Sequence, residues 1–68
     1  MVGDLWMHDL RNAVNTALTA SSVVRLLLQK GDVARALQFS KEVEEACERC
    51  RTLIVEKQKS EDDGPGPA

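Results

Sequence analysis

Apolar residues recur every three or four positions along the first half of the chain, which is the spacing of one face of an α-helix. No Gly or Pro interrupts the sequence from Asp4 to Lys30. We therefore predict a helix over about residues 4–30, with a heptad-like seam that faces a partner helix. The seam residues are Trp6, Leu10, Ala13, Ala17, Ala20, Val24 and Leu27, and the apolar stripe is widened by Leu5, Val14, Leu18 and Leu28.

The second half of the chain repeats this spacing and predicts a helix over about residues 32–58. Its predicted seam consists of Val33, Ala36, Ser40, Val43, Cys47, Cys50 and Ile54, with Leu37, Phe39, Ala46 and Leu53 on its flanks. Charged residues are expected on the opposite, solvent-facing side, namely Lys41, Glu42, Glu45, Glu48, Arg49 and Glu56.

The two predicted helices are separated only by a short turn, so we expect an antiparallel hairpin over residues 4–59. Gly31 suits the left-handed position just past a helix end, after Lys30 in the last turn, and Asp32 is a good N-cap. The apolar stripes are wider than one helix pair needs, which favours an all-α homodimer in which two hairpins form a four-helix bundle. The acidic segment 60–68 ends in Gly-Pro-Gly-Pro-Ala and is expected to be a disordered tail.

Composition excludes several classes of protein. The 68 residues carry 9 Lys and Arg against 11 Asp and Glu, so the net charge of −2 argues against nucleic-acid binding. Two aromatic residues, Trp6 and Phe39, are poor material for a β-sandwich. The sequence has no apolar run of the ~18 residues that a membrane span requires and no recognisable signal peptide. We expect a cytoplasmic protein whose segment makes no membrane contact.

The two cysteines form a Cys-x-x-Cys motif, Cys47-Glu48-Arg49-Cys50. Three residues of separation cannot close a useful disulfide loop, and neither a second Cys pair nor a nearby His completes a zinc site. Because both cysteines fit the predicted seam, we interpret them as packing residues rather than metal ligands or a redox pair, and we predict no metal site.

The polar side of the first helix is unusual because it carries few of the Lys and Glu residues that normally solubilise a helix. Instead, residues at helical spacing place imidazole, guanidinium, amide and hydroxyl groups in one strip, with Asp9 next to it. The strip contains His8, Arg11, Asn12, Asn15 and Thr19. Such groups suit contact with an anionic, planar group such as a phosphoryl group, and Arg11 and Asn15 are therefore candidate binding residues.

The segment Met7-His8-Asp9-Leu10-Arg11-Asn12 resembles the H-box of the dimerisation and phosphoacceptor domain of two-component sensor histidine kinases. His8, Asp9 and Asn12 match the family pattern place for place, and the resemblance covers roughly residues 4–57. The family also has a helical hairpin that dimerises into a four-helix bundle. Ala13 departs from the pattern, because the family often has Pro there, so the kink that Pro would cause is not expected to carry over.

The resemblance implies that His8 accepts a phosphoryl group and passes it to the aspartate of a response-regulator receiver domain. Asp9 would orient the imidazole and stabilise its cationic form, and Asn12 would position a water in the phosphatase reaction. No cofactor is expected in this chain, because ATP and magnesium would belong to a separate histidine-kinase ATP-binding domain acting in cis or trans. Two alternatives remain open: a stand-alone histidine phosphotransfer protein, and a helical module that only mediates dimerisation.

Overall fold

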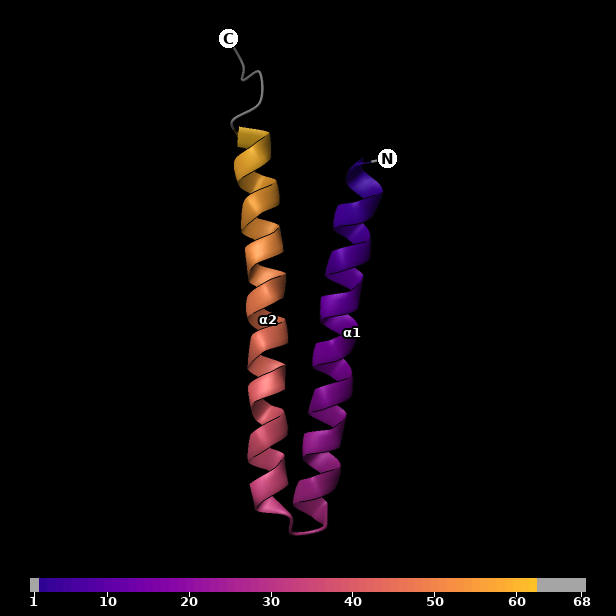
Figure 1. Cartoon of the computed structure of the whole chain (residues 1–68), viewed down its shortest axis with the longest axis vertical. Coiled ribbons are helices and arrows are strands. Elements are labelled where there is room, and N and C mark those ends of the chain that lie inside the picture. Colours follow the sequence, from indigo (N-terminus) through magenta and orange to yellow (C-terminus); the bar gives the residue numbers. More distant parts are fainter. Residues whose placement is uncertain (1, 63–68) are drawn as a thin grey trace.

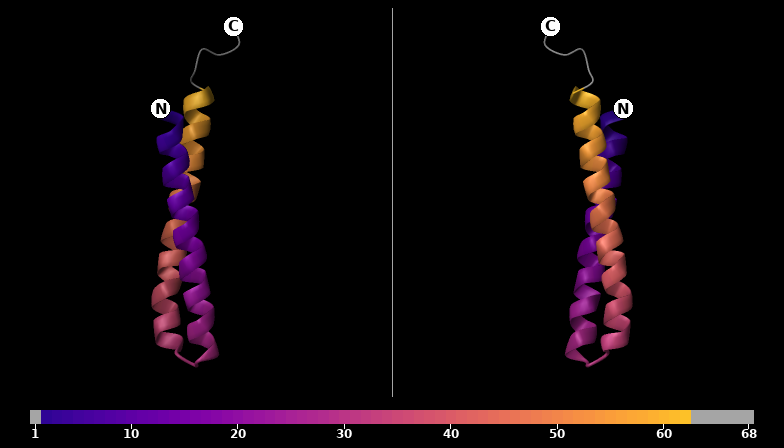
Figure 2. Two further views of the ribbon diagram at one scale, coloured as in Figure 1. Left: turned by 90° about the vertical axis from the view of Figure 1, so that its right-hand side faces the viewer. Right: turned by 90° about the vertical axis from the view of Figure 1, so that its left-hand side faces the viewer.

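The protein is an antiparallel hairpin of two long helices (Figure 1). The computed structural model describes the backbone of residues 2–62 and the side chains of residues 5–61. Helix α1 spans Val2–Gln29 and helix α2 spans Val33–Asp62. The side views show that the two helices cross at a shallow angle instead of running exactly parallel (Figure 2). The predicted all-α class and the packing of two helices against each other are confirmed.

Both helices are slightly longer than the sequence pattern predicted. Residues 60–62, which we assigned to the disordered tail, are the last residues of α2. The physical reason is that the sequence after Gly31 contains no further Gly or Pro until Gly64, and the intervening polar residues are mostly good helix formers. The rest of the predicted tail, residues 63–68, lies outside the described residues.

The turn between the helices has the predicted glycine-based geometry. Gly31 has a φ of +82°, which is the left-handed conformation of a helix C-cap. The N–H of Asp32 donates to the carbonyl of Leu27 at 2.8 Å, and the N–H of Gly31 donates to the carbonyl of Leu28 at 3.0 Å, which together form a Schellman motif. Asp32 Oδ1 then accepts a hydrogen bond from the N–H of Arg35 at 3.2 Å and caps α2. Lys30 lies in this turn, one residue beyond the end of α1.

The predicted seam of α1 is confirmed: all seven of its residues are buried or half-buried. The predicted seam of α2 is only partly right. Ala36, Ser40, Val43 and Cys50 are buried or half-buried as expected, but Val33, Cys47 and Ile54 are exposed. Their places in the interface are taken by three residues that were expected on its flanks, namely Phe39, Ala46 and Leu53.

The cross-helix contacts define one register. The indole N–H of Trp6 donates to the carbonyl of Leu53 at 2.8 Å. Ala13 and Ala46 line one hollow between the helices, and Ala20 and Phe39 line the next. In each step seven residues forward on α1 correspond to seven residues back on α2, as an antiparallel heptad pairing requires.

The centre of this interface is built from small side chains. The buried apolar residues are Ala13, Ala20, Ala36 and Ala46, and no large side chain among the described residues is fully buried. Small residues let the helices approach closely, but they remove little apolar surface from water. Each Å² of buried apolar surface stabilises the fold by only about 25 cal/mol, so the total stabilisation is small. A single hairpin of this composition therefore has a weak core.

The two edges of the seam differ in character. In heptad terms Ala13, Ala20 and Ala46 occupy position d, which forms one edge of the seam. Position a forms the other edge, and position e lies just beyond position a. In an antiparallel pair the e positions of both helices lie on one side of the hairpin and the g positions lie on the other. Seven of the ten exposed large apolar residues fall at positions e and b, and we call them the apolar face: Met7, Val14, Leu18, Leu28, Val33, Leu37 and Ile54.

Candidate functional site

His8 lies near the N-terminal end of α1, about a quarter to a third of a turn away from the apolar-face residues Met7 and Val14, and its side chain is exposed. The ring is held by Asn12, one helical turn later, whose Nδ2 lies 3.4 Å from His8 Nδ1. The Asn12 amide can present either its oxygen or its nitrogen to the ring, so it can accept a hydrogen bond from Nδ1–H or donate one to a bare Nδ1. Only the first of these arrangements leaves Nε2 without a proton and able to react, because a neutral imidazole carries its proton on one of the two nitrogens.

The other predicted site residues lie near this pair, and none of them forms a side-chain hydrogen bond with it among the described residues. Asp9 is half-buried, and no hydrogen bond links it to His8 in the part of the chain that the structure describes. Arg11 is exposed, at position b of its heptad, on the same side as the apolar face. Asn15 is exposed, lies one helical turn after Arg11, and lines a hollow between the helices. The structure therefore brings His8 and Asn12 together, and of Arg11 and Asn15 only Asn15 lines the hollow.

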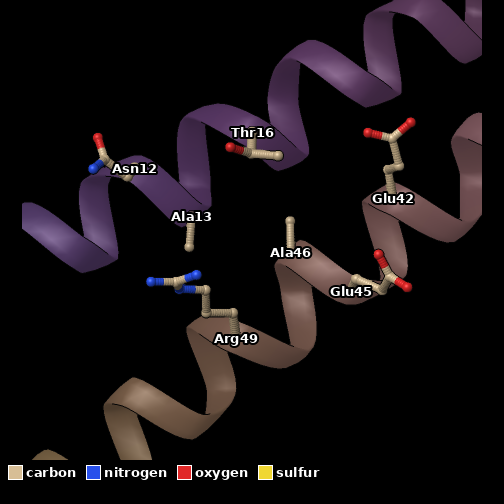
Figure 3. A pocket seen from close by; sticks show the side chains of 7 residues that line it. All are labelled: Asn12, Ala13, Thr16, Glu42, Glu45, Ala46 and Arg49. Carbon is tan, nitrogen blue, oxygen red and sulfur yellow. The ribbon is translucent and has the colours of Figure 1, made fainter.

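A polar cleft runs along the side of the hairpin opposite the apolar face. Two adjoining hollows form it, and they share Asn12, Thr16 and Glu42. Three members of the polar strip predicted on α1 line this cleft, namely Asn12, Asn15 and Thr19. From α2 the cleft receives Glu42, Glu45 and Arg49 (Figure 3). We use the name "the cleft" for the surface formed by these residues and Thr16.

The residues that α2 contributes to the cleft were not predicted as site residues. Glu42, Glu45 and Arg49 were expected on the solvent side of the second helix, away from its partner. Glu42 and Arg49 occupy position g, directly beside the seam residues Val43 and Ala46, so their side chains reach the edge of the interface. A correct assignment of the α2 seam would have revealed them.

The open end of the hairpin is fastened close to His8. Trp6 bonds across to α2 through its indole N–H, and Lys57 Nζ lies 5.4 Å from the centre of the Trp6 ring, within the range of a cation–π contact. These interactions confirm that Trp6 packs at the end of the helix pair. They hold the first turns of α1 against α2 two residues before His8.

The cysteines behave differently from each other. Cys50 is half-buried in the seam, as expected, whereas Cys47 is exposed at position e and does not pack between the helices. Both thiols are free. No group of three His, Cys, Asp or Glu side chains among the described residues is arranged to hold a metal ion.

Comparison with protein-family models, with curated proteins and with solved structures finds no match to this chain. Neither described helix combines the length and the apolar character needed to cross a membrane.

Proposed function

We propose that this chain is a dimeric phosphoacceptor domain of two-component signalling, which carries a phosphoryl group on His8 and delivers it to the aspartate of a receiver domain. The observation that carries the proposal is the exposed imidazole of His8 whose Nδ1 is engaged by Asn12. The residues that make this arrangement are also those through which the sequence resembles the histidine-kinase H-box.

In this mechanism Asn12 selects the reactive tautomer of His8. When Asn12 Oδ1 accepts a hydrogen bond from Nδ1–H, the lone pair of the neutral imidazole is on Nε2. Nε2 attacks the phosphorus atom, the new N–P bond forms, and the bond from phosphorus to the donor's leaving group breaks. The reverse sequence transfers the phosphoryl group from Nε2 to an aspartate oxygen. Phosphoryl transfer depends mainly on such positioning and on charge neutralisation.

Asp9, Arg11 and Asn15 have supporting roles in this proposal. Asp9 places a negative charge next to His8 in the sequence, which stabilises the imidazolium that forms as phosphorus is attacked. Arg11 is exposed and available to a carboxylate of the docked receiver, and Asn15 presents an amide to the same partner from the cleft.

The apolar face is the surface through which we propose that two copies associate into a four-helix bundle. A lone hairpin leaves Leu18 and Leu37 63% and 64% exposed and has no fully buried large side chain among its described residues. A second copy covers this face with an identical one, as two-fold symmetry allows. His8 lies outside the apolar face, so the dimer presents two accessible imidazoles.

The proposal is tested with potassium phosphoramidate, a small donor that phosphorylates imidazole nitrogen and releases ammonia. The wild-type chain is expected to gain one phosphoryl group per copy, on an acid-labile and base-stable N–P bond seen by mass spectrometry and ³¹P NMR. His8→Gln is expected to gain none, because the chain has no other histidine. The phosphorylated chain is then mixed with a panel of purified receiver domains, and transfer to at least one of them is expected.

Any exposed imidazole reacts slowly with phosphoramidate, so a relocated histidine provides the matched control. The double variant H8Q/S22H places an imidazole two heptads further along α1, at another exposed position. We expect the wild-type chain to react about tenfold faster than this variant. Equal rates, or a wild-type phosphoryl group that no receiver accepts, would favour the module that only mediates dimerisation, for which the apolar face is the supporting observation.

A further inference from the structure

The side of α1 that faces away from α2 carries no Lys, Arg, Asp or Glu over most of its length. The seam assignment places heptad positions c and f on this side. Six exposed residues occupy these positions, and we call them the outer face: His8, Asn12, Asn15, Thr19, Ser22 and Leu26. The same positions of α2 are charged at Lys41, Glu45 and Glu48. The outer face therefore differs from the corresponding side of α2, although both are exposed.

The stability of the hairpin does not account for the polar residues of the outer face. Asn, Thr and Ser are weaker helix formers than the Lys and Glu that α2 uses at these positions. Within residues 5–61 the side chains of Asn15, Thr19 and Ser22 form no hydrogen bond. Leu26 is 55% exposed and lies outside the apolar face. Depletion of charged residues is typical of the centre of a protein–protein interface, so this composition indicates a surface that another protein covers.

The charges around the outer face favour an anionic partner. After Asp9, α1 contains no Asp or Glu, and Arg11 and Arg25 border the outer face at position b. By contrast, α2 has four Glu between Glu42 and Glu48. A phosphoryl group on a side chain carries a charge of about −1.5 to −2 at pH 7. A phosphorylated or acidic partner is therefore repelled by α2 and can approach along α1.

We infer that the outer face of α1 docks the receiver domain and selects receivers whose docking surface is uncharged, an inference that rests on the proposed function. His8 lies at one end of this surface, where the receiver aspartate must meet Nε2. Leu26 lies 18 residues further along α1, about 27 Å away, and offers an apolar contact at the other end. A Lys or Arg on the receiver would lose water on docking without finding a carboxylate on the outer face, which is costly. Uncharged and apolar side chains avoid this cost.

The test compares Thr19→Glu with Thr52→Glu. Both substitutions place a carboxylate at an exposed position c, the first on the outer face and the second on α2. Transfer is measured to the receiver of the panel that accepts the phosphoryl group fastest from the wild-type chain. Each transfer rate is divided by the rate at which the same variant reacts with phosphoramidate, a donor too small to need docking. We expect this ratio to fall about tenfold for Thr19→Glu, because an unpaired interfacial charge is costly, and to stay at the wild-type value for Thr52→Glu.

The selection of uncharged receivers is tested with the rest of the panel. Thr19→Glu should raise the same ratio for receivers that carry Lys or Arg beside their aspartate, because the new carboxylate gives those cations a partner. Circular dichroism verifies that both glutamate variants keep wild-type helicity. Equal ratios in the two variants would overturn the outer face as the docking surface. A ratio that falls for every receiver would overturn the selection by charge.

A second measurement locates the docking surface without any substitution. The fastest-accepting receiver, unphosphorylated, is added to the ¹⁵N-labelled wild-type chain. The largest NMR shifts are expected at the backbone amides of Asn15, Thr19 and Ser22, and smaller ones at Lys41 and Glu48. Shifts concentrated on α2 would overturn the inference. Failure of the wild-type chain to be phosphorylated, or to transfer to any receiver, would instead overturn the proposed function.

Discussion

The two sides of the hairpin share one seam but carry opposite chemistry. On one side, residues of both helices leave seven large apolar side chains exposed, including Leu18 and Leu37. On the other side, amides, hydroxyls, carboxylates and the Arg49 guanidinium line the cleft. Both sides are built by positions of the same two helices that flank the a and d residues, so the difference arises from the side chains and not from the backbone.

The function that we propose would use the two sides of the hairpin for different tasks. An apolar surface of this kind on a small helical protein is characteristic of association with another protein surface. The cleft and the His8 edge of α1 remain available on the outside of such an assembly. If the two sides act independently, a substitution on one side will leave the function of the other side intact.

The largest effect is expected from a charge on the apolar face. Leu37→Glu would place an unpaired carboxylate in the proposed dimer interface twice, once for each copy, at a cost of roughly 2–4 kcal/mol at each site. We expect the variant to be monomeric at micromolar concentration and to lose most of its cooperative thermal unfolding. Analytical ultracentrifugation and circular dichroism measure both properties.

Gln38→Glu provides the matched control, because it introduces the same charge at the next residue, which is exposed and lies outside both the apolar face and the cleft. It should remain dimeric. A wild-type chain that sediments as a stable monomer, or a Leu37→Glu variant that stays dimeric, would show that the apolar face is not the interface.

The sequence predicted the helices, the turn and the α1 seam, but not which edge of the α2 seam faces α1. The reason is that α2 has two neighbouring apolar columns that follow the same spacing. Ala46 lies beside Cys47, and Leu53 lies beside Ile54, so either column can complete the seam. The geometry of the whole pair decides between them, because the chosen column must interdigitate with the small residues of α1.

The same ambiguity explains what could be predicted about the site. His8 and Asn12 belong to one helix, so their contact follows from a spacing of one turn. Arg49 comes from the other helix, and its place in the cleft depends on the register and on the choice of seam. Sequence patterns specify contacts within a helix well, whereas contacts between helices require the packing of both.

A second prediction concerns the shared seam and should affect both sides together. Ala46→Leu would force a larger side chain between helices that approach closely at Ala13, and overpacking of this kind costs about 1–3 kcal/mol. We expect a lower midpoint in urea unfolding and a slower reaction of His8 with phosphoramidate. Ala34→Leu, the same change at an exposed position of α2, should alter neither property. An unchanged midpoint for Ala46→Leu would contradict the close packing of the seam.

A third prediction uses the turn as a reference for stability alone. Gly31→Ala meets no steric obstacle from neighbouring atoms, but the φ of +82° is strained for a residue with a Cβ, so the variant should be less stable by about 1 kcal/mol. Urea unfolding measures this loss. Phosphorylation of the folded variant should proceed at the wild-type rate, because the turn lies at the far end from His8. A variant that is as stable as wild type would show that the turn does not require the left-handed conformation.

The smallest effect is expected from a substitution of Asn12, and this substitution tests directly whether Asn12 sets the tautomer of His8. Asn12→Ala removes the amide that lies 3.4 Å from Nδ1, an exposed interaction worth up to about 1 kcal/mol, so the tautomer ratio should change by no more than about fivefold. In the proposed mechanism Asn12 stabilises the tautomer with Nδ1–H. Nitrogen-15 NMR of the His8 ring should therefore show a smaller fraction of Nδ1–H in the variant. Asn15→Ala removes an amide that also lines the cleft and should leave the ratio unchanged. An increase in the Nδ1–H fraction of Asn12→Ala would show that Asn12 donates to Nδ1, and that the nitrogen left without a proton is not Nε2.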